Sequence, residues 1–392
     1  MIFGRKTRDT QRTAFPKATS QQDPPKDTTA ATSKTTDKSK PLSSKGASDA
    51  YKKAVEESYT TGLRDVRTTT LFRVTNFELF VKPNVIVMGL ERKLHVGTKL
   101  GAMGEHITLN TGAKMPLIGL GTFQTKGEDI VHKTIESILK NGYRSIDTAG
   151  GYKNEADIGN SLKELLPKYD LTRKDLFITS KLPPKDQGYD NCRTSCMTSL
   201  ENLQMEYLDL YLIHWPGTQK MKHDDVRNVQ NRKESWMQME TLLKEGKLKS
   251  IGVSNYTLNH MEELLSFCTI KPAVLQIEHH PHLVQKELVE FCRDNDIHFQ
   301  AYSSLGTMME DNKLLNDPLV VEIANCYTKT PAQILLKWAV QQHIGVIPKS
   351  TNPVHIAANI DIFDFELSSL DLQRLTELDK QHHYCWNPIT IV

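Results

Sequence analysis

Four residues whose side chains can exchange protons stand at or just beyond the ends of apolar runs: Asp147, Tyr152, Lys181 and His214. A tyrosine phenol ordinarily has a pKa of about 10, but an adjacent cation stabilises the phenolate and helps the phenol to donate a proton near neutral pH. Lys181 could be that cation, and Asp147 could keep it protonated in a partly desolvated pocket. His214, as a neutral imidazole, could donate to a carbonyl oxygen and orient it. The four groups are suited to protonating a developing alkoxide, and they need a hydride from elsewhere.

The elements that must position these groups begin near residue 107. From there to the end, apolar runs typical of strands alternate with stretches whose apolar residues recur at helical spacing. The strand-like runs cover residues 117–123, 144–149, 176–182, 208–215, 250–255, 274–280, 299–305 and 345–350. Eight strand–helix units in roughly 280 residues predict a closed parallel barrel, because each parallel strand needs a crossover helix.

We therefore expect an α/β fold, a (β/α)8 TIM barrel over residues 105–392, with a hairpin at 107–119 that plugs one mouth. The alternative is an open doubly wound sheet. Its phosphate fingerprint is missing, because Gly119 and Gly121 are not followed by a third glycine and the sequence contains no GxxxxGK[ST] motif. In barrels of this kind the chemistry collects at the carboxyl ends of the strands. Besides the four groups above, those ends hold Ser254, Asn255, Gln276, Tyr302, Lys349 and Ser350.

Residues 1–104 differ in composition from the predicted barrel. The first fifty carry ten Lys or Arg, five Asp and no Glu, with only five large hydrophobic residues. Such a segment cannot bury enough apolar area to offset the entropy of ordering, so we expect a largely disordered, low-complexity arm. The aspartates and the lack of an apolar stripe argue against an organellar transit peptide. A formal net charge of +2 excludes a strong overall field toward nucleic acid.

Residues 62–89 resemble the segment before the spanning helix in a family of small single-pass integral membrane proteins (small integral membrane protein 8). No run of eighteen apolar residues follows, so no spanning helix is expected, and no secretory leader is evident. Six scattered cysteines without CxxC spacing favour reduced thiols and a cytoplasmic location. Two interpretations of the arm remain. It is a regulatory or anchoring segment, or a spurious join of two neighbouring coding regions, and we favour the join.

Three longer motifs carry a second resemblance. GYRSIDTAGGYKNEADIG (142–159), LKSIGVSNY (248–256) and IPKS (347–350) resemble the three signatures of the aldo-keto reductase superfamily. The signatures are long and occur in the family's order, and the resemblance covers about residues 106–392. It implies NADPH-dependent reduction of aldehydes or ketones on a (β/α)8 barrel.

The intervals between the four acid–base residues match the family's catalytic tetrad: 5 residues from Asp147 to Tyr152, 29 from there to Lys181, and 33 from there to His214. By this resemblance Tyr152 is the general acid, Lys181 lowers its pKa, Asp147 holds Lys181, and His214 orients the carbonyl group.

The same resemblance implies a nicotinamide cofactor site. Tyr302 would stack on the nicotinamide, while Ser254, Asn255 and Gln276 would bind its carboxamide. The residues implied for the pyrophosphate and the adenosine phosphate are Ser303, Leu305, Thr307, Lys349, Ser350, Asn352, His355 and Asn359. His355 departs from the family, which commonly has an arginine there. An imidazole grips phosphate less firmly than a guanidinium, so we expect NADPH, favoured by Lys349, with use of NADH as a further hypothesis.

The substrate is less well specified. Phe123, Trp215 and Trp386 are expected to wall the pocket. The loop PGTQKMKHDDVRNVQNR and the tail QHHYCWNPITIV are short for this family, which favours an open site and broad specificity. The sequence is similar to the glyoxal or methylglyoxal reductase and prostaglandin F synthase-like branch.

We expect a monomer that acts on a small carbonyl compound and binds no nucleic acid, membrane or metal. His279, His280 and His282 cluster around Pro281, but neighbours in a strand face opposite ways and no further ligand has the right spacing. The alternative function is a catalytically weak nucleotide-binding scaffold or channel-associated subunit of the same fold.

Overall fold

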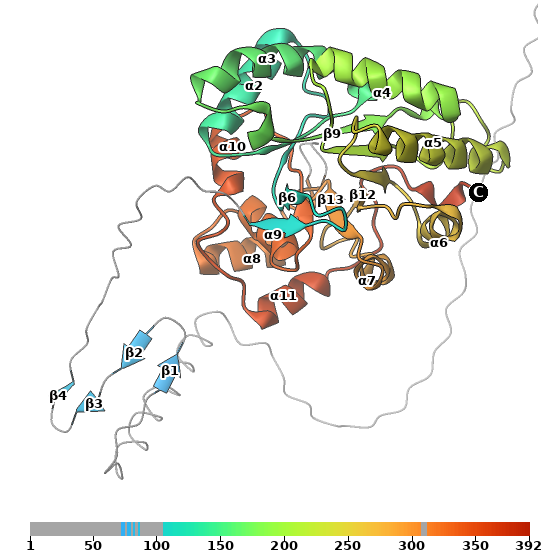
Figure 1. Ribbon diagram of the computed structural model, residues 1–392. Helices are drawn as coiled ribbons and strands as arrows, with labels where there is room; N and C mark the ends of the chain where they lie inside the picture. Colours follow the sequence, from blue (N-terminus) through green and yellow to red (C-terminus); the bar gives the residue numbers. More distant parts are fainter. Residues whose placement is uncertain (1–71, 75–76, 80, 83–84, 87–104, 307–311) are drawn as a thin grey trace, which may run out of the picture. The chain divides into compact units, whose positions relative to one another are not determined.

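The computed structural model describes residues 72–74, 77–79, 81–82, 85–86, 105–306 and 312–392. The chain divides into two units, residues 1–96 and 97–392. In the first unit, two short antiparallel pairs are described: β1 (Phe72–Val74) with β2 (Phe77–Leu79), and β3 (Val81–Lys82) with β4 (Val85–Ile86) (Figure 1). The expected disorder of the remaining residues before 105 lies outside the described residues.

The second unit is built on one sheet of eight parallel strands, joined in the order in which they occur along the chain. The strands are β7 (Leu120–Gly121), β8 (Ser145–Asp147), β9 (Phe177–Leu182), β10 (Leu210–Ile213), β11 (Ile251–Ser254), β12 (Val274–Glu278), β13 (His298–Tyr302) and β14 (Gly345–Val346). Each falls within or at the edge of one of the eight predicted runs.

The sheet closes on itself between its first and last strands. Ile118 pairs in parallel with Val346, whose backbone N–H donates to Leu117 O (2.8 Å) and whose O accepts from Gly119 N (2.9 Å). A Cβ atom at Gly121 would lie 2.7 Å from the carbonyl oxygen of Ile347, so only glycine allows this close approach. The predicted (β/α)8 barrel is confirmed.

Helices follow the strands and cover the outside of the barrel (Figure 1). They are α2 (Glu128–Lys140), α3 (Glu155–Lys168), α4 (Tyr189–Leu203), α5 (Arg227–Lys244), α6 (Leu258–Phe267), α7 (Lys286–Asp294), α8 (Pro318–Tyr327), α9 (Pro331–Val340), α10 (Pro353–Ile360) and α11 (Ser369–Thr376). Four short 3-10 turns accompany them: η1 (Gly150–Tyr152), η2 (Arg173–Asp175), η3 (Pro184–Asp186) and η4 (Pro388–Thr390).

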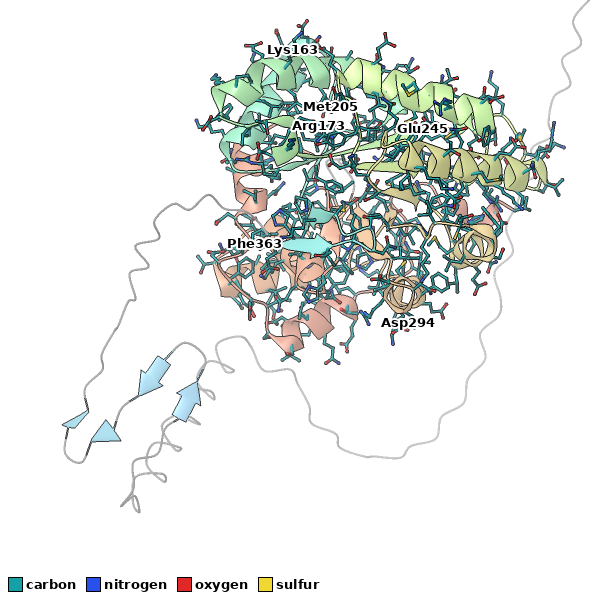
Figure 2. The ribbon with its side chains drawn as sticks, viewed as in Figure 1. Lys163, Arg173, Met205, Glu245, Asp294 and Phe363 are labelled. Atoms are coloured by element: carbon teal, nitrogen blue, oxygen red, sulfur yellow. The ribbon has the colours of Figure 1, made fainter. Side chains whose placement is uncertain are left out.

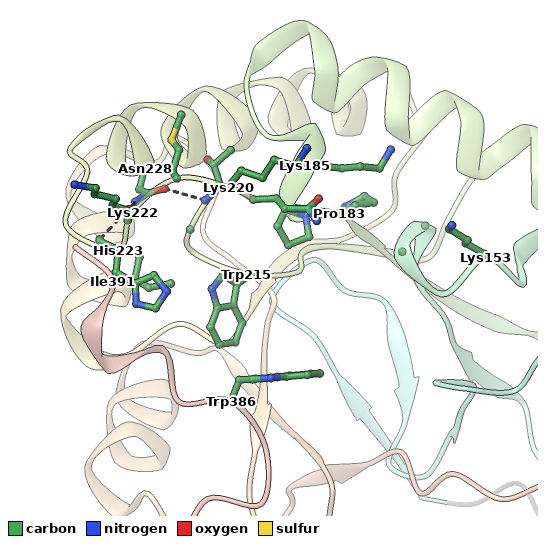
Figure 3. Close-up of a pocket in the computed structure, with 17 residues that line it drawn as sticks. Lys153, Pro183, Lys185, Trp215, Lys220, Lys222, His223, Asn228, Trp386 and Ile391 are labelled. Carbon is green, nitrogen blue, oxygen red and sulfur yellow. Dashed lines mark hydrogen bonds between the residues drawn. The ribbon is translucent and has the colours of Figure 1, made fainter. Parts of the chain in front are cut away.

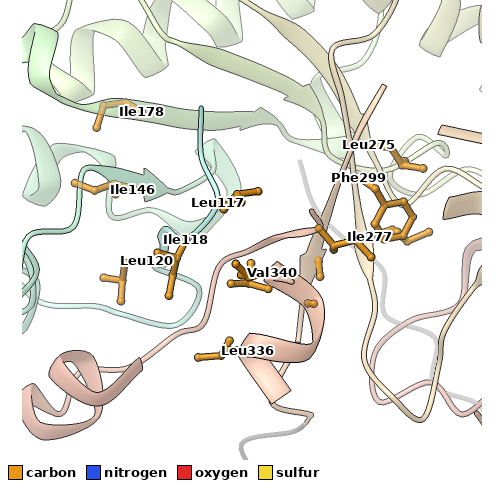
Figure 4. Packing of buried hydrophobic residues seen from close by; sticks show 14 of the residues in the cluster. Leu117, Ile118, Leu120, Ile146, Ile178, Leu275, Ile277, Phe299, Leu336 and Val340 are labelled. Carbon is orange, nitrogen blue, oxygen red and sulfur yellow. The ribbon is translucent and has the colours of Figure 1, made fainter. Parts of the chain in front are cut away.

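Apolar side chains of the strands and of the inner helix faces form one continuous core. In α2, Val131, Ile135, Ile138 and Leu139 recur at helical spacing and are all buried. Figure 4 shows buried apolar side chains of β7, β8 and α9 in this core, among them Leu120, Ile146 and Val340. The outer faces of the helices carry charged side chains, such as that of Lys163 on α3 (Figure 2). Among the described residues, no helix is long and apolar enough to cross a membrane.

The amino-terminal end of the barrel is plugged by the predicted hairpin. Its strands β5 (His106–Thr108) and β6 (Lys114–Pro116) pair antiparallel. Leu109 and Met115 pack in one buried cluster with the first residues of three barrel strands, Phe177, Leu210 and Val274. The other mouth, at the carboxyl ends of the strands, is left to carry the chemistry.

Candidate active site

The four predicted acid–base residues come from three neighbouring strands and the segments just after them. Asp147 ends β8, Lys181 lies in β9, and His214 follows β10, while Tyr152 ends the turn η1 that follows β8. Because these strands are adjacent and parallel, their carboxyl ends meet at one edge of the barrel. The structure brings the four side chains together there.

Lys181 is the centre of the group and is only 1% exposed. Its Nζ donates to the Asp147 carboxylate, to Thr148 O at 2.9 Å and to the Tyr152 hydroxyl at 3.3 Å. Burial by itself would lower the pKa of Lys181, but Asp147 and then Tyr152 outweigh burial and hold the pKa above its usual value. The ammonium ion is therefore fixed in its charged form beside the phenol.

Tyr152 is half-buried, and burial raises the pKa of its phenol. Lys181 opposes that rise, but the net shift is upward, so the lysine limits the effect of burial instead of producing a phenol more acidic than usual. Lys181 thus acts on the pKa of Tyr152 in the direction expected from the sequence, although burial outweighs it. At neutral pH the hydroxyl is protonated, which suits a proton donor.

His214 lies against Tyr152, with ring centroids 5.5 Å apart and planes at 73°. Burial, and then the charge of Lys181, lower the pKa of His214 to about 3. The imidazole is therefore neutral at physiological pH. Its Nδ1 is buried and has no hydrogen-bond partner among the described residues.

A second set of polar residues lies across the mouth on β11 to β13. Asn255, whose φ of 63° is left-handed, directs Nδ2 to His214 O at 2.9 Å. Its Oδ1 accepts from the Tyr302 hydroxyl at 2.6 Å, and its Nδ2 also reaches Ser254 Oγ at 3.2 Å. These predicted cofactor residues form one network with the backbone of His214.

Gln276 joins the two sets. Its Nε2 donates to Asp147 Oδ2 at 2.7 Å and to Gln300 Oε1 at 2.9 Å. Gln276 and Gln300 are opposite each other in the parallel register of β12 and β13, and both are buried. Gln300 was missed by the sequence analysis, although it lies two residues before Tyr302 and so faces the same side of its strand.

A second missed residue supports the loop between Asp147 and Tyr152. Asn154 is 1% exposed. Its Oδ1 accepts from Thr148 Oγ1 at 2.7 Å, and its Nδ2 donates to the carbonyl oxygens of Thr122 and Thr125, both at 3.0 Å. Thr148 in turn supplies the carbonyl oxygen that accepts from Lys181, so Asn154 fixes the backbone beside the ammonium ion.

The residues predicted for the phosphate groups lie at the ends of β13 and β14. Ser303 has a left-handed φ of 51° and contacts Cys385 Sγ at 3.2 Å, while Leu305 is half-buried. Lys349 is half-buried, Ser350 is buried, and His355 is exposed on α10. Asn359, also on α10, is buried. Thr307 lies outside the described residues.

Asn352 caps α10, with Oδ1 accepting from Val354 N at 2.9 Å. The positive end of the α10 dipole therefore lies close in the chain to Lys349 and His355. A helix N-terminus with a lysine and an imidazole fits the phosphate groups of a dinucleotide, and Tyr302, Ser254 and Asn255 fit an aromatic carboxamide.

The three predicted aromatic wall residues are placed differently from one another. The ring of Phe123 lies edge-on to Tyr152 at 5.2 Å. Trp215 and Trp386 line a cavity of about 840 Å³, which Phe123 does not line (Figure 3). Trp386 is 71% exposed, so the cavity has an open side, as the short loop and tail predict.

The histidine cluster around Pro281 is divided among separate environments. His279 stacks on Trp338 at 4.9 Å, His280 Nε2 contacts Glu278 at 3.1 Å, and His282 Nε2 contacts Asp317 at 3.0 Å. His279 packs among aromatic rings of the core, whereas His280 and His282 lie against Tyr384 of the carboxyl-terminal tail.

Comparisons with known proteins agree with this geometry. The model of the Aldo/keto reductase family matches residues 117–380. Glyoxal reductase of Bacillus subtilis is 41% identical over 287 residues, covering 73% of this chain and 97% of the relative. Aldo-keto reductase family 1 member A1 of Homo sapiens is 37% identical over 301 residues, covering 73% and 92%.

Solved structures agree as well. The aldose reductase of Schistosoma japonicum has a TM-score of 0.65 at 37% identity, covering 71% of this chain and 93% of its own. An aldo-keto reductase of Bombyx mori in complex with NADP has a TM-score of 0.66 at 31% identity, covering 73% and 96%.

The amino-terminal part matches a different family. Residues 53–96 match a domain of unknown function (DUF4500), a range that contains the segment 62–89 discussed above. The barrel and the match over residues 117–380 identify the larger part. The chain belongs to the aldo/keto reductase family and is an NAD(P)H-dependent oxidoreductase.

Proposed function

We propose that this protein reduces aldehydes and ketones to alcohols, with NADPH as the hydride donor and Tyr152 as the proton donor. The observation that carries the proposal is the buried chain Asp147–Lys181–Tyr152, which ends beside the neutral ring of His214. A structural ion pair would need only the carboxylate and the ammonium ion. The phenol and the neutral imidazole add a proton donor and a positioning group at the mouth.

In this mechanism, His214 binds the carbonyl oxygen and orients it toward the Tyr152 hydroxyl. When bound, NADPH supplies the hydride to the carbonyl carbon. The Tyr152 O–H then gives its proton to the oxygen, and the ammonium group of Lys181 stabilises the phenolate that remains. Asp147 keeps Lys181 charged throughout, since Lys181 would otherwise lose part of its charge to burial.

The residues proposed to hold the cofactor divide by chemistry. Tyr302, Ser254 and Asn255 would hold the nicotinamide end, and Gln276 would do so while keeping Asp147 in place. Those for the phosphates are Ser303, Leu305, Thr307, Lys349, Ser350, Asn352, His355 and Asn359. The complex of the Bombyx mori relative with NADP supports the choice of cofactor.

Tyr152→Phe gives the decisive test, because the substitution removes the hydroxyl and keeps the ring. With a panel of aldehydes, the loss of NADPH absorbance should be at least about a hundredfold slower in the variant than in the unmodified protein. NADPH binding, monitored through the quenching of tryptophan fluorescence, should persist in the variant. Absence of turnover on every carbonyl compound by the unmodified protein would favour the nucleotide-binding scaffold.

Cofactor preference is tested separately by comparing kcat/KM for NADPH and NADH. His355 has replaced a guanidinium with an imidazole, so we expect NADPH to be preferred by a modest factor, with measurable use of NADH. An absolute preference for NADH would overturn the choice of NADPH.

The substrate range is proposed to be broad. The open cavity beside Trp215 and Trp386 supports this, and the similarity to glyoxal reductase supports small dicarbonyl compounds among the substrates. We further propose a monomer in the cytoplasm, which size-exclusion chromatography and cell fractionation can test.

A further inference from the structure

The ionisable side chains that line the cavity beside the catalytic group are all basic. Lys153, Lys185, Lys220, Lys222 and His223 line it, together with Trp215 and Trp386 (Figure 3). None of the residues that line this cavity in the described part of the chain is an aspartate or a glutamate. Four lysines around an aromatic wall form a site for a molecule that is apolar in its body and negatively charged at one end.

The lysines come from three consecutive strand-to-helix loops. Lys153 directly follows Tyr152 in a left-handed conformation (φ 60°), and Lys185 lies in η3 after the strand that holds Lys181. Lys220 and Lys222 lie between β10 and α5. These loops follow β8, β9 and β10, the strands of the acid–base group, whereas the residues proposed for the cofactor phosphates follow β13 and β14. The basic cavity therefore lies in the part of the mouth next to the acid–base group, where the substrate is proposed to bind.

Most of this charge is not neutralised within the protein. Lys185 Nζ lies 3.4 Å from Asp186 Oδ2. Asp225 contributes to the field near Lys222, but its carboxylate is held by Arg227 at 2.5 Å. Lys153, Lys220 and Lys222 form no salt bridge with any residue that the structure describes. Their ammonium groups are thus available to an incoming anion.

The loop that carries Lys220 and Lys222 is fixed by buried hydrogen bonds. Asn228 is 1% exposed, and it donates to Lys222 O at 2.9 Å and accepts from Thr218 N at 2.8 Å. Gln187, also buried, donates to Trp215 O at 2.7 Å and to Gly217 O at 3.0 Å. The backbone under the lysines is therefore held in place, so binding an anion needs ordering of the side chains alone.

We propose that the preferred substrates of this site are carbonyl compounds that carry a carboxylate or phosphate group at the end remote from the reacting carbon. The inference rests on the proposed carbonyl reduction and specifies its substrate class. The aromatic surface of Trp215 and Trp386 takes the body of the substrate, and the lysines take its anionic end.

A matched pair of aldehydes tests the charge. 4-Carboxybenzaldehyde is an anion, and methyl 4-formylbenzoate is neutral with the same ring. The ester group withdraws more electron density than the carboxylate and so favours the ester in the chemical step, which means that a preference for the acid cannot come from intrinsic reactivity. At low ionic strength, kcat/KM for the acid should exceed that for the ester by about two- to tenfold, mostly through KM. The ratio should shrink as salt is added, because these lysines are exposed and screened.

The double variant Lys220→Gln with Lys222→Gln should lower the ratio of acid to ester toward one. Lys163→Gln, on the outer face of α3, is the matched control and should keep the ratio of the unmodified protein. Asn228→Ala should lower the ratio too, with the lysines intact, if the fixed loop backbone matters. Equal kcat/KM for acid and ester, or a ratio that the double variant leaves unchanged, would overturn the inference.

A binding measurement separates this inference from the proposed function. Tryptophan fluorescence, titrated with benzoate and with benzamide in the Tyr152→Phe protein, should show tighter binding of benzoate that weakens with salt. No turnover of any aldehyde would refute carbonyl reduction. Turnover of both aldehydes without discrimination, and equal binding of benzoate and benzamide, would refute the anionic substrate class alone.

Discussion

The acid–base group and the residues proposed to receive anions use charge in opposite ways. After β8 to β10, the charges that perform the proposed proton transfer are buried and paired, as Lys181 is with Asp147. After β14, Lys349 and His355 are partly or fully open to solvent. A group that must keep a particular protonation state gains from burial beside a fixed partner, whereas a group that must receive an arriving anion gains from staying unpaired.

The largest effect is expected from breaking the buried pair. Lys181→Met should lower kcat by about a thousandfold or more, since it removes the charge that supports the Tyr152 phenolate. It should also lower the free energy of unfolding by about 3–5 kcal/mol, because Asp147 is left buried without its cation. Urea denaturation and steady-state kinetics measure the two effects.

Lys168→Met is the matched control for that variant, because Lys168 pairs with Glu136 at an exposed site, does not line the cavity, and surface pairs of this kind contribute little to stability. Adding Asp147→Asn to Lys181→Met should recover part of the lost stability without recovering activity. If the Lys181→Met protein were as stable as the unmodified protein, the buried pair of Lys181 and Asp147 would not stabilise the fold, and the contrast with the exposed charges would fail.

The pH dependence sharpens the comparison through Tyr152 and His214. Burial raises the pKa of Tyr152 and lowers that of His214 to about 3, so both groups keep one protonation state across neutral pH. Reduction should therefore vary little between about pH 5 and pH 9. Alcohol oxidation needs the phenolate and should rise by up to about tenfold per pH unit in that range. A bell-shaped reduction profile centred near pH 6.5 would contradict this assignment.

Glu278, at the end of β12, tests whether the carboxyl-terminal tail depends on a buried charge. Burial raises its pKa, but hydrogen bonds from His280 and from the Tyr384 N–H (2.6 Å) outweigh burial, and the net pKa is lowered. A lowered pKa stabilises the fold above the unfolded value of about 4.3, and the contribution is lost as pH falls through the folded value.

Glu278→Gln should therefore cost about 1–3 kcal/mol at neutral pH, and the difference from the unmodified protein should vanish once the pH is low enough to protonate Glu278 in the folded protein. Hydrogen exchange of residues 382–387 reports the loosening of the tail. Exchange that is equally slow in the variant would mean that the tail is held by packing.

The smallest effect is expected from the exposed charges. Lys349→Met should raise KM for NADPH by about two- to tenfold, because one solvated contact to a phosphate is lost. KM for NADH, which lacks the adenosine 2′-phosphate, should change less. An equal rise for both cofactors would place Lys349 at the pyrophosphate instead.

The eight strands could be predicted from periodicity, and the four acid–base residues from their places at or after the strand ends together with the family resemblance. Apolar runs mark the strands, and the polar residue that ends each run marks the mouth. The runs overestimate the outermost strands, since β7 and β14 have two residues each, and Gly119 and Gly121 meet the last strand through an irregular closure.

Gln300 and Asn154 could not be recognised from the sequence, because Gln300 is one polar residue in an apolar run and Asn154 is one of several polar residues in a loop. The role of each depends on contacts that only the fold makes, to Gln276 for Gln300 and to the carbonyl oxygens of Thr122 and Thr125 for Asn154. The direction of the Tyr152 pKa could not be predicted either. Whether Lys181 or burial prevails depends on how much of the phenol the fold covers.

The hairpin β5–β6 closes the amino-terminal end of the barrel, where Leu109 and Met115 pack against the first residues of β9, β10 and β12. The interior above it is a packed core and not a pore, so nothing can pass from that end to the acid–base group. Both reactants must therefore be taken up, and both products released, at the carboxyl-terminal mouth.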